Sequence, residues 1–258
     1  MNRWNRSWTV SMDLRSHGMG SRTGKEIRIT MRRRWNKKAV SLVLAAAVAA
    51  CAMTGCGNGT KEIATKDFVS SSVVMTVGKD DINYGEIRSY CYFLKRQYEG
   101  SFGDQIWNYN LGTGGLSGKS TIGDEAKEEV INTITQVHII CAEAEEENVE
   151  LTSDEKDQAN LAAQELVESA DTADRSEYDL NVSQISEIYQ QHALAKKMYF
   201  VSTDEASTEV SDDEAATREE KEKVISQRQT DMFKKKYAGW MKDVRVNIGK
   251  DFWNQMEL

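Results

Sequence analysis

The chain has 258 residues, with 33 Lys and Arg against 41 Asp and Glu, a formal net charge of −8 and no proline. This length is enough to bury a real hydrophobic core, and the absence of proline allows long helices. The acidic balance repels nucleic-acid phosphates, so we expect no nucleic-acid partner.

The first 55 residues are expected to lie outside the folded domain. Residues 1–30 show no periodic pattern, which indicates either a start assigned too early, with Met31 as the true beginning, or an added extension. From Met31 onward, five basic residues precede the uncharged run 39–52, which is typical of a signal peptide. Those 14 residues would rise about 21 Å as a helix, short of the roughly 30 Å hydrocarbon core, so cleavage is expected.

The uncharged run ends in residues 53–56, Met-Thr-Gly-Cys, which resemble the lipobox of bacterial lipoproteins. The resemblance implies cleavage between Gly55 and Cys56 and lipid on Cys56, which would hold the protein at the outer face of the cytoplasmic membrane. Residues 48–51 also fit, so Cys51 competes with Cys56, and cleavage without lipidation is a third alternative. The polar tether that follows Cys56 favours Cys56.

Cleavage would make the remaining chain strongly acidic. Residues 1–55 contain 11 Lys and Arg against 2 Asp and Glu, which leaves 22 and 39 in residues 56–258, a net charge of −17. Such a charge keeps a protein soluble and repels anionic headgroups. The membrane is therefore expected to be a partner only through the lipid on Cys56, with residues 56–71 as a flexible tether.

Residues 72–258 are predicted to form one mainly α domain. β-branched segments predict a strand near each end, at 72–77 and 244–248, and Gly78 begins a tight turn. Apolar residues at helical spacing predict helices at 84–98, 124–147, from about 152 onward, 182–200 and 223–242, separated by polar segments at 171–178 and 202–222. Because helices fill the space between the two strands, we expect a two-stranded sheet that pairs the N- and C-terminal strands.

A glycine-rich segment at 100–123 is predicted to be a flexible surface loop. It carries the aromatic residues Phe102, Trp107 and Tyr109 among seven glycines. Its end superficially resembles a phosphate-binding loop, but Thr113 stands where that motif requires glycine, which argues against nucleotide binding.

The remaining candidate residues point to structure and not to catalysis. Cys91 and Cys141 could form one disulfide, or could be two buried thiols on apolar helix faces. His138 and His192 also lie on apolar faces and are predicted to be structural. We find no zinc-ligand spacing and no catalytic triad, so no catalytic residue, metal or cofactor is predicted.

Three segments resemble the SurA-like and PrsA-like extracytoplasmic foldases: the strand, turn and Glu-Ile helix start at 77–87, the helix end at 144–155 and the acidic step at 210–215. The resemblance implies a helical SurA-N-like chaperone domain whose first and last strands pair. The parvulin module that isomerises prolyl bonds in this family would follow Glu214, but this chain continues directly into its last helix.

The resemblance therefore implies a non-catalytic holdase that binds unfolded, newly exported polypeptides. Its candidate client contacts are Phe102, Trp107 and Tyr109, although these aromatics could instead cap the core. Two alternatives stay open: a lipoprotein with residual peptidyl-prolyl isomerase activity, and an envelope lipoprotein that binds a dedicated partner.

Overall fold

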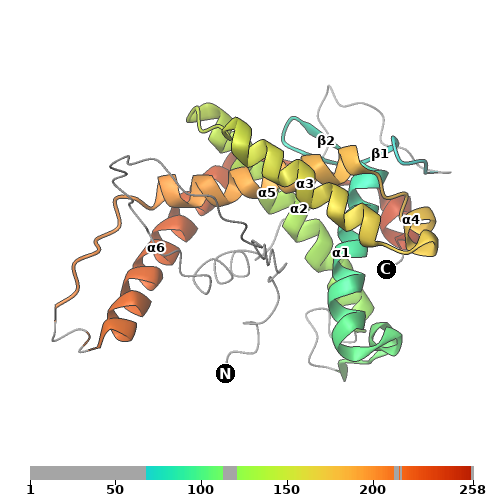
Figure 1. The fold of residues 1–258 in the computed structure, drawn as a ribbon, viewed down its shortest axis with the longest axis horizontal. Helices are drawn as coiled ribbons and strands as arrows, with labels where there is room; N and C mark the ends of the chain where they lie inside the picture. The colour runs from blue at the N-terminus through green and yellow to red at the C-terminus, as the bar shows by residue number, and fades with distance from the viewer. Residues whose placement is uncertain (1–67, 113–120, 212–214, 216, 257–258) are drawn as a thin grey trace, which may run out of the picture.

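The computed structural model describes residues 68–112, 121–211, 215 and 217–256 (Figure 1). The predicted signal peptide, the cleavage site at Gly55 and both candidate lipidation residues, Cys51 and Cys56, lie outside these residues. The described chain is mainly helical with one small antiparallel sheet, as predicted.

The sheet has three strands, so the prediction of two strands was wrong. Strands β1 (Val73–Val77), β2 (Asp80–Asn83) and β3 (Val246–Ile248) are arranged in the order β2-β1-β3. The predicted pairing of the terminal strands is confirmed, with Met75 opposite Ile248. The missed strand forms because Gly78, at φ +58°, reverses the chain within two residues and places Asp80 opposite Val77.

Seven α-helices are described, together with the short 3₁₀ helices η2 (Asp104–Asn108) and η4 (Met241–Asp243). Their bounds are α1 Tyr84–Phe102, α2 Ile122–Glu146, α3 Ser153–Ser169, α4 Thr172–Glu177, α5 Val182–Ser202, α6 Arg218–Trp240 and α7 Lys250–Gln255. Five of the seven correspond to predicted helices. The exceptions are α4, which lies in the predicted polar break, and α7, which follows the last strand.

Side-chain caps fix where three of the long helices, α2, α3 and α6, begin. Thr121, Thr152 and Thr217 each accept a hydrogen bond from the backbone of the third helical residue, whose carboxylate accepts from the threonine backbone in return. Such a capping box satisfies two backbone N–H groups that would otherwise lack partners. Helix α3 thus begins directly after Thr152, as the predicted start near residue 152 indicated.

The core lies where α5 meets α1, α2 and α3, and it continues onto the sheet. The most extensive helix packing is between α3 and α5. Ile134, Ile185, Ile188 and Met198 are fully buried among the helices, as are Val74, Met75 and Ile82 in the sheet. One continuous apolar cluster therefore joins sheet and helices.

The two ends of the described chain meet beside the start of α1. Phe252 of α7 is fully buried, and its ring contacts the rings of Phe68 and Tyr84 at centroid distances of 5.8 and 6.0 Å. Phe68 also contacts Tyr84 at 5.6 Å. Contacts of the folded body thus begin four residues before the predicted domain start at Ser72.

Figure 1 shows α3 and α5 running across the molecule, with two projections on the lower side of the view. One projection is the C-terminal end of α1 with η2, and the other is the N-terminal end of α6. Within the part of the chain described, no helix combines the length and apolarity needed to cross a membrane.

Candidate functional site

The projection at the end of α1 contains the predicted client contacts. We call it the aromatic tip and define it as Tyr98, Phe102, Trp107 and Tyr109. Helix α1 ends at Gly103, whose φ of +78° turns the chain into η2 and whose N–H donates to Glu99 O at 2.9 Å.

The tip is ordered by contacts with the start of α2. Ile122 N donates to Tyr109 O at 3.0 Å, and Asn110 forms an isolated bridge with Thr121. Residues 104–108 form the helix η2, so this part of the predicted flexible loop is a defined element. Residues 113–120 of that loop lie outside the described chain.

Trp107 holds the tip together. Its ring contacts that of Tyr98 at a centroid distance of 5.5 Å, and its Nε1 donates to Glu99 Oε1 at 2.7 Å. The side chain is half-buried and packs against the core. The structure therefore places Trp107 in a packing role, the alternative that the sequence left open.

Phe102 and Tyr109 are the outward-facing residues of the tip. Their exposed fractions are 69% and 63%, the largest among the large apolar side chains described. Single exposed apolar residues are common on protein surfaces, but two aromatic rings at one projecting end provide a larger apolar contact. Two of the three predicted client contacts, Phe102 and Tyr109, are therefore accessible to a partner.

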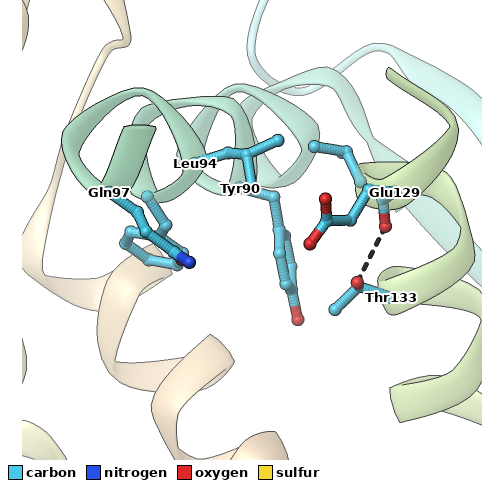
Figure 2. A pocket seen from close by; sticks show the side chains of 7 residues that line it. Tyr90, Leu94, Gln97, Glu129 and Thr133 are labelled. Atoms are coloured by element: carbon cyan, nitrogen blue, oxygen red, sulfur yellow. Dashed lines mark hydrogen bonds between the residues drawn. The ribbon is translucent and has the colours of Figure 1, made fainter. Parts of the chain in front are cut away.

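A small pocket separates α1 from α2 next to the tip (Figure 2). Figure 2 shows Glu129 and Thr133 of α2 facing Tyr90 of α1, with Thr133 Oγ1 donating to Glu129 O at 2.8 Å. The cavity volume is about 20 Å³, whereas small-molecule sites usually occupy roughly 300–1,000 Å³. The pocket has room for about one water molecule or a small alkyl group.

A second, open depression of about 520 Å³ lies beside α3 and α5. Its lining is mainly polar: Asn160, Val182, Ser183, Ser186, Glu187 and Gln190. Ser186 and Gln190 donate to Asn160 Oδ1, so these polar groups already satisfy one another. The depression therefore offers a ligand no large apolar side chain other than Val182.

A buried ion cluster lies where β2, α1 and α2 meet, and the sequence did not reveal it. His138 Nδ1 lies 2.9 Å from Asp80 Oδ2, and His138 Nε2 lies 2.9 Å from Glu86 Oε1. The side chains of His138 and Glu86 are 8% and 7% exposed. Burial alone would lower the pKa of His138, but the hydrogen bonds to the two carboxylates outweigh it and raise the pKa to about 9.

A second imidazole lies close to this cluster. His192 Nε2 is 2.9 Å from the Tyr90 hydroxyl, and burial followed by the charge of His138 lowers the pKa of His192 to about 4. His192 is thus neutral near pH 7, and its Nε2 shares a hydrogen bond with the Tyr90 hydroxyl whose direction depends on the tautomer of the ring.

These groups stabilise the fold and are not arranged for catalysis. The His138 imidazolium donates from both nitrogens and keeps no lone pair for use as a base. Cys141 Sγ donates to Gln191 O at 3.4 Å, and burial, then Asp80 and Glu86, raises its pKa to about 12. Such a thiol is a poor nucleophile.

Cys91 and Cys141 are free thiols in the structure, with Cys91 buried and Cys141 partly buried. Cys91 is buried in α1, and burial raises its pKa to about 12. Across the described ranges, no group of three or more His, Cys, Asp or Glu side chains is placed to hold a metal ion.

The chain matches no protein-family model, no curated protein and no solved structure. The resemblance to SurA-like and PrsA-like foldases is therefore a prediction that rests on its three sequence segments.

Proposed function

We propose that this protein is an extracytoplasmic lipoprotein, anchored through Cys56, that binds unfolded exported polypeptides without catalysis. The observation that carries the proposal is the aromatic tip, where packed Trp107 fixes a turn that exposes Phe102 and Tyr109. The signal-peptide pattern and lipobox support the location, and the motif resemblance supports the class of client.

Two exposed rings suit weak and reversible binding. Fully burying an aromatic or aliphatic side chain contributes about 1.5–3 kcal/mol, so Phe102 and Tyr109 together could contribute roughly 3–6 kcal/mol. Association itself costs about 4 kcal/mol or more, so a client would need several such contacts along its length. A holdase needs this behaviour, because it must release its client.

The test is suppression of aggregation by the chain from Gly57 to Leu258. At stoichiometric amounts it should keep a proline-poor unfolded client soluble, and the double variant Phe102→Ser/Tyr109→Ser should lose most of this effect. The matched control is Leu161→Ser/Val201→Ser, which removes apolar side chains that are 62% and 45% exposed on α3 and α5. This control should behave as the unmodified protein does.

Prolyl isomerisation of a test peptide is measured in parallel. Suppression without isomerisation supports the holdase. Isomerisation by the pure protein would favour the residual-isomerase alternative. Failure in both assays would leave the lipoprotein that binds a dedicated partner as the better proposal.

A further inference from the structure

The surface around the aromatic tip is strongly acidic. Residues 99–112 and 121–129, which include most of the tip and the start of α2, contain six acidic residues and one basic residue, Lys127. The acids are Glu99, Asp104, Asp124, Glu125, Glu128 and Glu129. They come from both sides of the turn that presents Phe102 and Tyr109.

Several of these carboxylates are oriented by neutral donors, which leave their negative charge in place. Trp107 Nε1 donates to Glu99, the Tyr98 hydroxyl donates to Glu129 at 3.2 Å, and Thr121 donates to Asp124. The pKa of Glu128 is raised, first by burial and then by the negative charges of Glu125 and Asp124. Negative charge is thus concentrated beside the exposed rings.

The apolar and acidic features are contiguous. The ring of Tyr98 contacts that of Phe102 at a centroid distance of 6.4 Å, while its hydroxyl reaches Glu129. Glu129 also lines the small pocket between α1 and α2 (Figure 2). A polypeptide bound on Phe102 would therefore pass directly beside carboxylates.

We propose that the aromatic tip selects apolar polypeptide segments that are flanked by Lys or Arg. Apolar side chains would cover Phe102 and Tyr109, and the basic flanks would face the acidic residues around them. The inference rests on the proposed function and adds the chemistry of the client. The net charge of −17 for residues 56–258 would draw such segments in from a distance, and the local acids would fix their position.

The experiment measures fluorescence anisotropy of three labelled peptides that share one apolar core and end in four Lys, four Ser or four Glu. At low salt the Lys peptide should bind about tenfold more tightly than the Ser peptide, because several exposed ion pairs act together. The Glu peptide should bind most weakly. In 1 M salt the Debye length falls to about 3 Å, and the preference should disappear.

Charge-neutralising variants locate the effect. Asp104→Asn/Glu125→Gln/Glu128→Gln should reduce the Lys-over-Ser preference to roughly threefold or less. Each lost carboxylate, exposed at Asp104 and partly buried at Glu125 and Glu128, removes a share of the attraction. The control Glu150→Gln/Asp157→Asn/Glu165→Gln removes the same number of charges from exposed positions on or beside α3, which lies away from the tip (Figure 1). The control should keep the full preference.

The outcomes separate this inference from the proposed function. If the unmodified protein binds the three peptides equally, or if the two triple variants lose the preference to the same extent, the proposed selection by charge is wrong. The proposed holdase function is unaffected by either result. If none of the peptides binds, or if the variant Phe102→Ser/Tyr109→Ser binds all three with unchanged affinity, the proposed function is wrong. The inference about the client, which rests on it, is then wrong as well. Matching thermal unfolding curves for all variants ensure that folding does not cause the differences.

Discussion

At the scale of single residues, His138 is a side chain whose replacement should cost substantial stability. It is the cation between two carboxylates, those of Asp80 and Glu86. His138→Gln would leave Glu86 buried without its cation, and would also remove the cation from the partly exposed Asp80. Breaking a buried ion pair costs about 3–5 kcal/mol. We expect a loss of this size in the free energy of unfolding, measured by urea denaturation.

The control for this prediction adds Glu86→Gln to His138→Gln. The double variant removes one of the two uncompensated charges and should recover part of the lost stability. A cost below about 1 kcal/mol for His138→Gln alone would mean that the cluster contributes no more than a surface ion pair.

The two imidazoles predict a maximum in stability near pH 6.5. The pKa of His138 rises from 6.5 to about 9 on folding, so its contribution is complete below pH 6.5 and is lost as the pH rises to about 9. The pKa of His192 falls from 6.5 to about 4, so the unfolded chain takes up a proton first and stability declines as the pH falls from 6.5 towards 4.

Urea midpoints measured between pH 4 and pH 9.5 check this prediction. On the alkaline limb, between pH 6.5 and about 9, the free energy of unfolding should fall by about 3 kcal/mol, because a change of one pKa unit corresponds to ~1.4 kcal/mol. His138→Gln should flatten this limb, and His192→Gln should flatten part of the acidic limb. The groups facing His138 are Asp80 and Glu86, with Cys141, Tyr90 and His192 nearby, so a limb that persists in His138→Gln would have to come from other groups.

Some site residues could be predicted from the sequence, and others could not. Aromatics set among glycines indicate exposed contacts, and Phe102 and Tyr109 agree with this pattern. Trp107 is packed because of its contacts with Tyr98 and Glu99, which no local pattern shows. The partners of His138 lie 52 and 58 residues away along the chain, so only the fold could bring them together.

At the scale of elements, the sequence predicted the long helices best. Their apolar spacing and their caps, threonine in α2, α3 and α6 and asparagine in α1 and α5, are local signals that agree with one another. Helix α1 continues beyond Gly100, where the prediction ended it. A helical glycine costs only about 1 kcal/mol relative to alanine, which packing at the tip can outweigh.

The elements that the sequence did not predict, β2, α4 and α7, carry too few residues for a periodic pattern. Strand β2 has four residues and only one of them, Ile82, is buried, so its pairing with β1 depends on the turn at Gly78. Helices α4 and α7 have six residues each. For such elements tertiary contacts decide the structure, as Phe252 illustrates for α7.

Phe252→Ala should test whether α7 belongs to the core. The fully buried ring contacts Phe68 and Tyr84, and removing a buried Phe costs about 3–5 kcal/mol. The control is Phe200→Ala at a ring that is 38% exposed, and it should cost clearly less. Equal unfolding midpoints for the two variants would show that α7 contributes little to the fold.

At the scale of the whole molecule, we propose that a membrane anchor precedes a helical body from which the aromatic tip projects. The anchor is tested by expressing the full chain in a bacterium that lipidates exported proteins. Cys56→Ala should move the protein from the membrane fraction to the soluble fraction, because the lipid would be its attachment. Cys51→Ala is the matched control and should stay with the membrane. The opposite pattern would assign the lipid to Cys51.

The central claim is that unfolded clients bind at the aromatic tip, and site-specific photocrosslinking tests it most directly. A photoreactive phenylalanine replaces one residue in each of three variants: Phe102, Tyr109 or, as the control, exposed Asp157 on α3. Each variant is irradiated with a chemically unfolded client. We expect crosslinks from positions 102 and 109, with competition by excess unlabelled client, and few from position 157. Crosslinks at 102 and 109 no stronger than at 157 would contradict the claim.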